Sequence, residues 1–157
     1  MGVWPHGFII IYIVCAWWWV DEYDIMGRMK NGKIIIPSGR LPWVHELRVA
    51  EVLSSVGYVV EFLPERSVKT ADILLNGVEF EIKSPVTSKM NTFEHNLKRA
   101  LKQSPNIIID VSRMDGRRMP ESKLKSFLVA ACRRHRQIKK LLLITKQGQI
   151  IDITSFV

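Results

Sequence analysis

The pattern of apolar and polar positions becomes regular from residue 41 onward. In residues 41–58, LPWVHELRVAEVLSSVGY, apolar side chains recur three and four residues apart, which predicts a helix that ends at Gly57. The next run, YVVEFLP, is rich in β-branched and aromatic residues and predicts a strand that ends at Pro64. Two further apolar runs, ADILL and VEFEIKSP, flank Asn76 and Gly77, a pair typical of a tight β-hairpin. The first half of the regular region is therefore predicted to be a helix followed by three strands.

The second half of the chain continues the alternation of helices and strands. Residues 92–103, TFEHNLKRALKQ, have the spacing of an amphipathic helix, and the run NIIIDV that follows is typical of a strand buried on both faces. Residues 121–136 predict a third helix, and KKLLLIT and QIIDI predict a closing hairpin around Gln147 and Gly148. The order helix, three strands, helix, strand, helix, two strands indicates an α/β protein whose regular part spans about 41–153.

The length of 157 residues favours a single domain, which we place at residues 28–157. Residues 1–27 are an apolar segment of unclear role with four of the five tryptophans. The uninterrupted apolar part, 8–20, is shorter than the roughly 20 residues that a spanning helix needs. A membrane-interface anchor in 1–20, a buried strand, and sequence outside the working domain are the three interpretations, and we favour the last.

Charge separates the same two regions. The whole chain carries +8, but residues 1–27 contain three acids and no Lys or Arg, so the remainder carries +11. Ten Lys and Arg residues lie between Arg113 and Lys140, against two acids. A solvated helix face would explain this run, but a basic body also attracts a polyanion such as nucleic acid. Two cysteines are too few for a disulfide framework, which favours a reduced cytosolic environment.

The candidate chemistry lies in the strand VEFEIK. Alternation places Val78, Phe80 and Ile82 on one face and the charged residues on the other. Asp72 begins the preceding strand of the hairpin, so its carboxylate is expected close to that of Glu81. Two carboxylates held together repel, and a divalent cation relieves the repulsion, while the lysine beside them would orient water and stabilise charge on phosphate. A solvated edge strand would have the same pattern.

The αβββαβ order, with Asp72 followed by Glu81-Ile82-Lys83, resembles the core of PD-(D/E)XK nucleases. Within that superfamily, ADILLNGVEFEIKSP and LKRALKQSPNIIIDVSR are similar to the C-terminal toxin domains of CdiA contact-dependent growth inhibition proteins. The resemblance implies a mixed central sheet flanked by helices, with a C-terminal helix and hairpin. It implies catalytic roles for Glu46, Asp72, Glu81 and Lys83, with Asp72 and Glu81 as ligands of a divalent metal (Mg, Mn or Zn). The proline that often precedes the Asp is replaced by Ala71.

Further residues are assigned supporting roles. Glu79 and Ser84 flank the catalytic residues of the strand, and Gln103 lies between a helix and a buried strand, where it would point at the site. Five cationic residues are expected to grip nucleic acid, namely Arg99, Lys102, Arg133, Arg134 and Arg136.

The sequence therefore predicts a metal-dependent endonuclease acting on RNA, specifically tRNA, with no small-molecule cofactor. The resemblance adds a cognate immunity protein as partner and a delivered or secreted effector that acts in the cytoplasm. Three alternatives stay open. They are a metal-independent RNase of the barnase/colicin/RelE-like group using His45 or His95, a DNA-directed nuclease, and a non-catalytic nucleic-acid-binding module.

Overall fold

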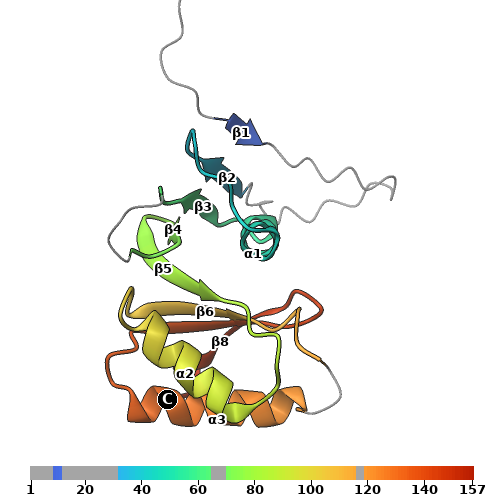
Figure 1. The fold of residues 1–157 in the computed structure, drawn as a ribbon, viewed down its shortest axis with the longest axis vertical. Coiled ribbons are helices and arrows are strands. Elements are labelled where there is room, and N and C mark those ends of the chain that lie inside the picture. The colour runs from blue at the N-terminus through green and yellow to red at the C-terminus, as the bar shows by residue number, and fades with distance from the viewer. Residues whose placement is uncertain (1–8, 12–31, 65–69, 116–118) are drawn as a thin grey trace, which may run out of the picture.

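The computed structural model describes residues 9–11, 32–64, 70–115 and 119–157, and these form a mixed α/β fold (Figure 1). The elements in chain order are β1 (Ile9–Ile11), β2 (Lys33–Ile36), α1 (Val44–Ser55), β3 (Val59–Phe62), β4 (Ile73–Leu75), β5 (Val78–Lys83), α2 (Met90–Ala100), β6 (Asn106–Asp110), α3 (Glu121–Arg134), β7 (Lys140–Ile144), β8 (Ile150–Asp152) and a 3₁₀ helix, η1 (Ile153–Phe156).

Within the described residues, the strands form one eight-stranded sheet whose spatial order follows the chain order from β1 to β8. The pairs β2–β3, β5–β6 and β6–β7 are parallel, and the other four pairs are antiparallel. Helices α1, α2 and α3 supply the crossovers that parallel neighbours require. At the β4–β5 turn, Asn76 and Gly77 have φ of 48° and 83°, the positive values that a type I′ turn demands.

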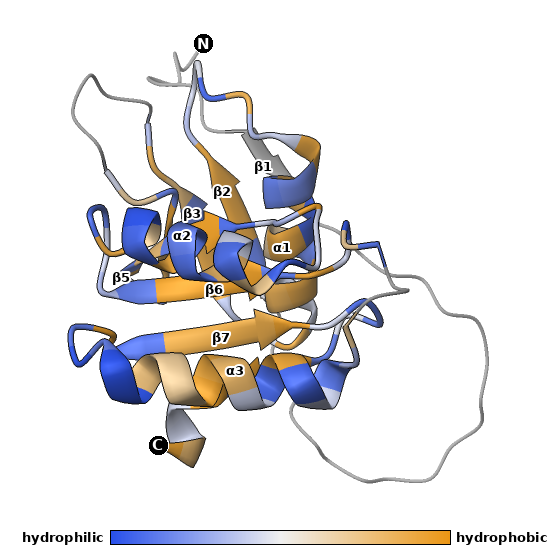
Figure 2. Cartoon of the chain, turned by 60° about the horizontal axis from the view of Figure 1, so that its bottom comes forward, coloured by the Kyte–Doolittle hydropathy of each residue, from blue (hydrophilic) through white to orange (hydrophobic). Residues whose placement is uncertain are grey.

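Two apolar clusters lie on opposite faces of the sheet. One packs α2 and α3 against β6 and β7, with Phe93, Leu97, Ile107 and Leu128 fully buried. The other packs α1 against β2 to β5 and the reverse side of β6 and β7. Consecutive β6 residues alternate between the clusters, as expected for a strand covered on both faces. In Figure 2, β6 and β7 are orange along much of their length, whereas much of α2 is hydrophilic.

The predicted α/β class and the order of elements from α1 to β8 are confirmed. The structure adds β1 and β2 upstream of the region that we expected to be regular, and β2 runs parallel to β3. Helix α2 begins at Met90, two residues earlier than predicted, and α3 ends at Arg134, two residues earlier than predicted.

The interpretations of residues 1–27 lie outside the described residues, except for β1, which pairs antiparallel with β2. In the part of the chain that the structure describes, no helix is long and apolar enough to cross a membrane.

Candidate active site

The β4–β5 hairpin brings together the acidic residues that the sequence singled out. Ile73 pairs with Phe80 across the antiparallel strands, so Asp72 and Glu81 are opposite each other one step further along the ladder. Asp72 Oδ2 accepts a hydrogen bond of 2.7 Å from the backbone N–H of Ile82. This bond fixes the Asp72 side chain beside β5, as the hairpin predicted.

Glu81 is buried, with only 1% of its surface exposed. Its Oε1 accepts hydrogen bonds from Lys83 Nζ and from Gln103 Nε2, and Gln103 follows α2 in a short turn. Among the described residues, no donor reaches Oε2. The carboxylate is therefore held on one oxygen, and the other is buried without a hydrogen bond.

The environment of Glu81 disfavours its charged form. Burial is the largest cause, the charge of Asp72 adds to it, and the ammonium of Lys83 opposes both, so that the pKa is raised to about 7. A protonated Glu81 can also share its proton with the Asp72 carboxyl, which raises the pKa further. A carboxyl group with a pKa near neutrality is able to exchange protons or to accept a cation in their place.

Glu46 lies near this pair but is engaged elsewhere. It is buried in the first turn of α1, where Oε2 accepts hydrogen bonds from the Trp43 backbone N–H at 2.9 Å and from Arg40 at 3.1 Å. Burial raises the pKa of Glu46, and the nearby charge of Asp72 raises it as well. The contacts with Trp43 and Arg40 lower the pKa, but the net shift is upward. Glu46 thus caps its helix, and its carboxylate oxygen points to Arg40 and Trp43.

The acidic pair has features that suit a hard divalent cation. Oε2 of Glu81 is buried without a hydrogen-bond partner, and the like charge of Asp72 acts on the same carboxyl group. Mg²⁺ is commonly held by one or two carboxylates and otherwise by water and substrate phosphates, which such a pair allows. In the described part of the chain, no group of three or more His, Cys, Asp or Glu side chains is placed to hold a metal. This donor set fits Mg²⁺ or Mn²⁺ better than Zn²⁺, which usually takes three or four protein ligands.

Two supporting residues lie away from the acidic pair. The Glu79 side chain is exposed, and its backbone carbonyl accepts bonds from Ser104 and Asn106. Ser84 donates to Asp110 Oδ2 at 3.4 Å instead of contacting Glu81. The structure thus brings Asp72, Glu81, Lys83 and Gln103 into one cluster and leaves Glu79 and Ser84 outside it.

Asp110 was missed by the sequence analysis, where it appeared only as the end of an apolar strand. It is fully buried at the end of β6 and accepts bonds from Arg48 Nη1 at 2.7 Å and from the Ser112 N–H and hydroxyl at 3.1 and 2.6 Å. Arg48 also donates to the Lys146 carbonyl, so the pair ties α1 to the ends of β6 and β7. Because 62 residues separate Arg48 from Asp110, no local pattern signals this contact.

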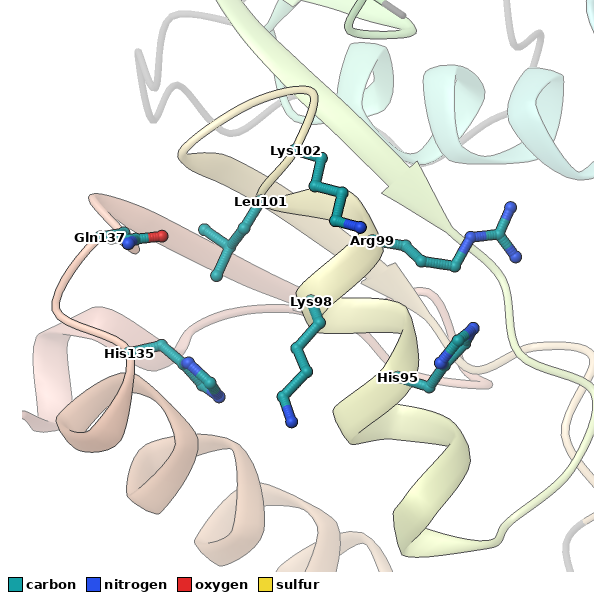
Figure 3. A pocket seen from close by; sticks show the side chains of 7 residues that line it. All are labelled: His95, Lys98, Arg99, Leu101, Lys102, His135 and Gln137. Carbon is teal, nitrogen blue, oxygen red and sulfur yellow. The ribbon is translucent and has the colours of Figure 1, made fainter.

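The predicted phosphate-gripping residues lie at the outer ends of α2 and α3. Arg99 and Lys102 are exposed and line a hollow beside α2 (Figure 3). Arg133, Arg134 and Arg136 are also exposed, although Arg134 donates to Glu94 at 3.0 Å.

The protein has a mixed α/β fold with an acidic cluster beside its central hairpin. Comparison with known proteins gives its family. The family model of the contact-dependent growth inhibition CdiA C-terminal domain matches residues 69–150, slightly more than half of the chain, so the protein belongs to this family. The match includes the whole acidic cluster and leaves Glu46 outside.

A solved structure described as a CdiA-CT/CdiI toxin and immunity complex from Burkholderia pseudomallei is similar in fold. Its TM-score is 0.58 at 18% identity, over 76% of this chain and 96% of that one. No curated protein sequence gives a match. The predicted CdiA resemblance is confirmed, and the broader PD-(D/E)XK assignment stays a prediction.

Proposed function

We propose that this domain is a toxin nuclease that hydrolyses phosphodiester bonds in tRNA with a divalent cation bound at Asp72 and Glu81. Membership of the CdiA C-terminal domain family supports a toxin of the nuclease type. The observation that carries the proposal is the state of Glu81, buried against Asp72 with one oxygen held by Lys83 and Gln103 and the other left without a donor.

The proposed cation is Mg²⁺ or Mn²⁺, held by the free oxygens of the two carboxylates. When bound, it would supply a Lewis acid for the phosphoryl oxygen and an activated water. Asp72 contributes a fixed ligand, because the Ile82 N–H already occupies Oδ2 and orients the side chain. Glu81 contributes Oε2, whose burial makes a positive partner favourable.

Lys83 and Gln103 have distinct proposed roles. The Lys83 side chain is 18% exposed, so its ammonium can reach solvent as well as Glu81, and it orients water or stabilises charge that develops on the phosphate. Gln103 donates to the same oxygen, Glu81 Oε1, and positions the carboxylate. Glu46 is proposed to act on the site through its charge, because Trp43 and Arg40 bind its Oε2 and, among the described residues, no third carboxylate is placed to join the pair in holding a metal.

The proposed substrate class follows from charge and shape. Exposed cations on α2 and at the end of α3 offer contacts to phosphate, which supply most non-specific affinity for nucleic acid. A folded RNA presents a compact backbone, 2′-hydroxyls and single-stranded ends that a cationic surface recognises by shape. We therefore propose tRNA rather than duplex DNA as the substrate.

Delivery and protection belong to the same proposal. The domain would act in the cytoplasm of a recipient cell after delivery, and a cognate immunity protein would block it. The structurally similar domain of known structure is described as part of a toxin and immunity complex, which supports this partner class.

The test is cleavage of tRNA, total RNA and plasmid DNA with and without EDTA, followed by add-back of Mg²⁺, Mn²⁺ or Zn²⁺. We expect discrete tRNA cleavage that EDTA abolishes and that Mg²⁺ or Mn²⁺ restores. Glu81→Gln should abolish it, while Glu79→Gln, which changes an exposed carboxylate two residues away on β5, should not. Rapid degradation of plasmid DNA with tRNA intact would overturn the RNA assignment.

A metal-independent RNase is the second candidate, favoured by the pKa of about 7 at Glu81, which suits a general acid or base at physiological pH. In that mechanism Glu81 would exchange protons directly. The two histidines considered from the sequence do not contact it, since His45 lies by Arg113 at 3.5 Å and His95 lines the hollow beside α2. Full tRNA cleavage in EDTA would select this candidate.

A further inference from the structure

A hollow of about 530 Å³ lies between the C-terminal part of α2 and the segment that follows α3, and we name it the α2–α3 hollow (Figure 3). Its polar lining comes from His95, Lys98, Arg99, Lys102, His135 and Gln137. None of the described residues that line it is acidic. Figure 3 shows Lys98 on the side of α2 toward His135, with His95 and Arg99 on the other side. The hollow is therefore an open cationic surface.

The neighbouring acid, Glu94, neutralises only part of this surface. Glu94 is bound by Arg134 at 3.0 Å and by His135 at 2.7 Å, and Lys98 is only within 3.8 Å of it. The hydrogen bond from His135 is the largest cause of a lowered pKa at Glu94. Glu94 thus joins α2 to the end of α3, and among the described residues no ion pair connects it to Arg99 or Lys102, the cations nearer the C-terminus of α2.

An anion in the hollow would be favourable to this group of neighbouring cations. Lys98 and Lys102 are four residues apart and Arg99 and Lys102 are three apart, spacings at which like charges repel. The negative end of the α2 dipole accounts for Lys98 and Arg99 in the last turn. It does not account for Lys102, which follows the helix, or for the polar side chains of His135 and Gln137 across the hollow.

The hollow is connected to the acidic cluster by a short piece of backbone. Lys102 lines the hollow, and its neighbour Gln103 donates to Glu81 Oε1. From Gln103 to His95 is eight residues, or ~12 Å along a helix. That length corresponds to about three or four nucleotides at a rise of ~3.4 Å each in a stacked strand.

We propose that the α2–α3 hollow is a nucleic-acid subsite, which binds the backbone of the strand within about four nucleotides of the phosphate at Glu81. Lys98, Arg99 and Lys102 contact its phosphates, and the imidazoles and Gln137 contact bases or sugars. An acidic protein would also be attracted to the cations. Nucleic acid is favoured because Lys102 lines the hollow and its chain neighbour Gln103 donates to the Glu81 carboxylate. The inference rests on the proposed function for its choice of ligand.

The experiment compares two variants with equal loss of charge. Lys98→Ala/Lys102→Ala changes the hollow, and Lys89→Ala/Lys123→Ala changes exposed lysines at the opposite ends of α2 and α3. Both are made in a Lys83→Ala background, and tRNA affinity is measured by fluorescence anisotropy across a salt series. The hollow variant should raise Kd about tenfold and lower the salt slope by ~1.5, as for two lost phosphate contacts. The control should stay within about twofold.

Poly-glutamate serves as the competing probe, and kinetics in the otherwise wild-type chain give a second measurement. The hollow variant should raise KM for tRNA and keep kcat, because the reacting groups are untouched. Equal weakening by both variants, or an unchanged tRNA affinity in the hollow variant, would overturn the subsite. A larger loss for poly-glutamate than for tRNA would assign the surface to an acidic protein. If the hollow variant selectively loses tRNA binding while the parent chain cleaves nothing with any metal, the subsite stands and the proposed nuclease function fails.

Discussion

The Glu81 carboxyl is the group in which burial, charge and hydrogen bonding act most strongly together. In the unfolded chain its pKa is near the ordinary 4.5, and in the folded chain it is about 7. Between these values the folded state binds more protons than the unfolded state, so the free energy of unfolding falls as pH rises through this window. Below about pH 4.5 this contribution is fully present, and above about pH 7 it is lost.

We expect the protein in EDTA to lose about 2–3 kcal/mol of unfolding free energy between pH 4.5 and 7 through this group. Urea titrations across that range measure the loss. Glu81→Gln should flatten the curve, and Glu79→Gln should reproduce the wild-type slope because its side chain is exposed. Asp72→Asn should lower the pKa of Glu81, since the Asp72 charge helps to raise it. An identical slope in Glu81→Gln and wild type would contradict the assignment.

Lys83→Ala gives a second prediction at this scale. It removes the ammonium proposed to act on water and phosphate but removes neither carboxylate, so tRNA cleavage should fall by at least about 100-fold while tRNA binding survives. Because Lys83 lowers the pKa of Glu81, the substitution should also shift the pH profile of the remaining activity upward. Lys89→Ala, at an exposed position before α2, is the matched control. Near-normal cleavage by Lys83→Ala would show that β5 carries no catalytic lysine.

Local sequence rules predicted part of this cluster and not the rest. The hairpin register is set by Asn76 and Gly77, so the closeness of Asp72 to Glu81 could be predicted from the turn. Gln103 was also expected to point at the site, but the burial of Glu81 was not predicted, because it depends on parts of the fold that are distant along the chain, such as the turn 22 residues later that contains Gln103.

At the level of elements, β5 departs from simple alternation. Phe80, Glu81 and Ile82 are all buried, whereas Val78, which we expected on the apolar face, is 49% exposed. The start of β5 lies at the end of the hairpin, away from the helices, and its middle lies between α1 on one face and α2 on the other. Because β5 runs from the rim of the sheet to its interior, the residues at its start are exposed and those in its middle are buried on both faces. Alternation of buried and exposed side chains therefore does not describe the whole strand.

Strand β2 was missed for a related reason. Its four residues, Lys33–Ile36, form a short run just before Pro37, and a short apolar run does not by itself distinguish a strand from other structure. Its pairing partner β3 lies beyond α1, so the parallel register of Ile34 with Val60 is a long-range contact. The order of α1 followed by β3 was predictable from the sequence. Strand β2, which precedes α1, was not.

The Arg48–Asp110 contact provides a prediction at the level of elements. Arg48→Met keeps the apolar stem on α1 but leaves the carboxylate of Asp110 buried without its cation, with only the Ser112 and Ser84 contacts. We expect a loss of about 2–4 kcal/mol of unfolding free energy, measured by urea titration. Arg113→Met changes an exposed arginine at the same end of the sheet and should cost under about 0.5 kcal/mol. Equal effects would mean that the Asp110 carboxylate does not need Arg48.

On the scale of the whole molecule, the two helix-covered faces of the sheet differ in the groups that they contain. The face under α1 contains the second apolar cluster and the Asp110 tie, and it holds the sheet together. The face under α2 and α3 combines the first cluster with the acidic group around Glu81 and the α2–α3 hollow at its rim. The sequence predicted the excess of basic charge, but only the folded arrangement gathers Lys98, Arg99 and Lys102 in one hollow with His135 and Gln137.

The N-terminal region provides the last prediction. From residue 32 onward the buried apolar core begins at Ile34, and the family match begins at residue 69. A chain starting at Met29 loses β1 and keeps β2, so it should still unfold cooperatively and cleave tRNA within about twofold of the full chain. Removing β1 exposes the outer edge of β2, and unpaired edges promote association, so the shortened chain should also self-associate more at high concentration. Urea unfolding, tRNA cleavage and analytical ultracentrifugation measure the three effects. Loss of the cooperative transition, with activity lost alongside it, would place residues 1–28 within the core and reject the boundary at residue 28.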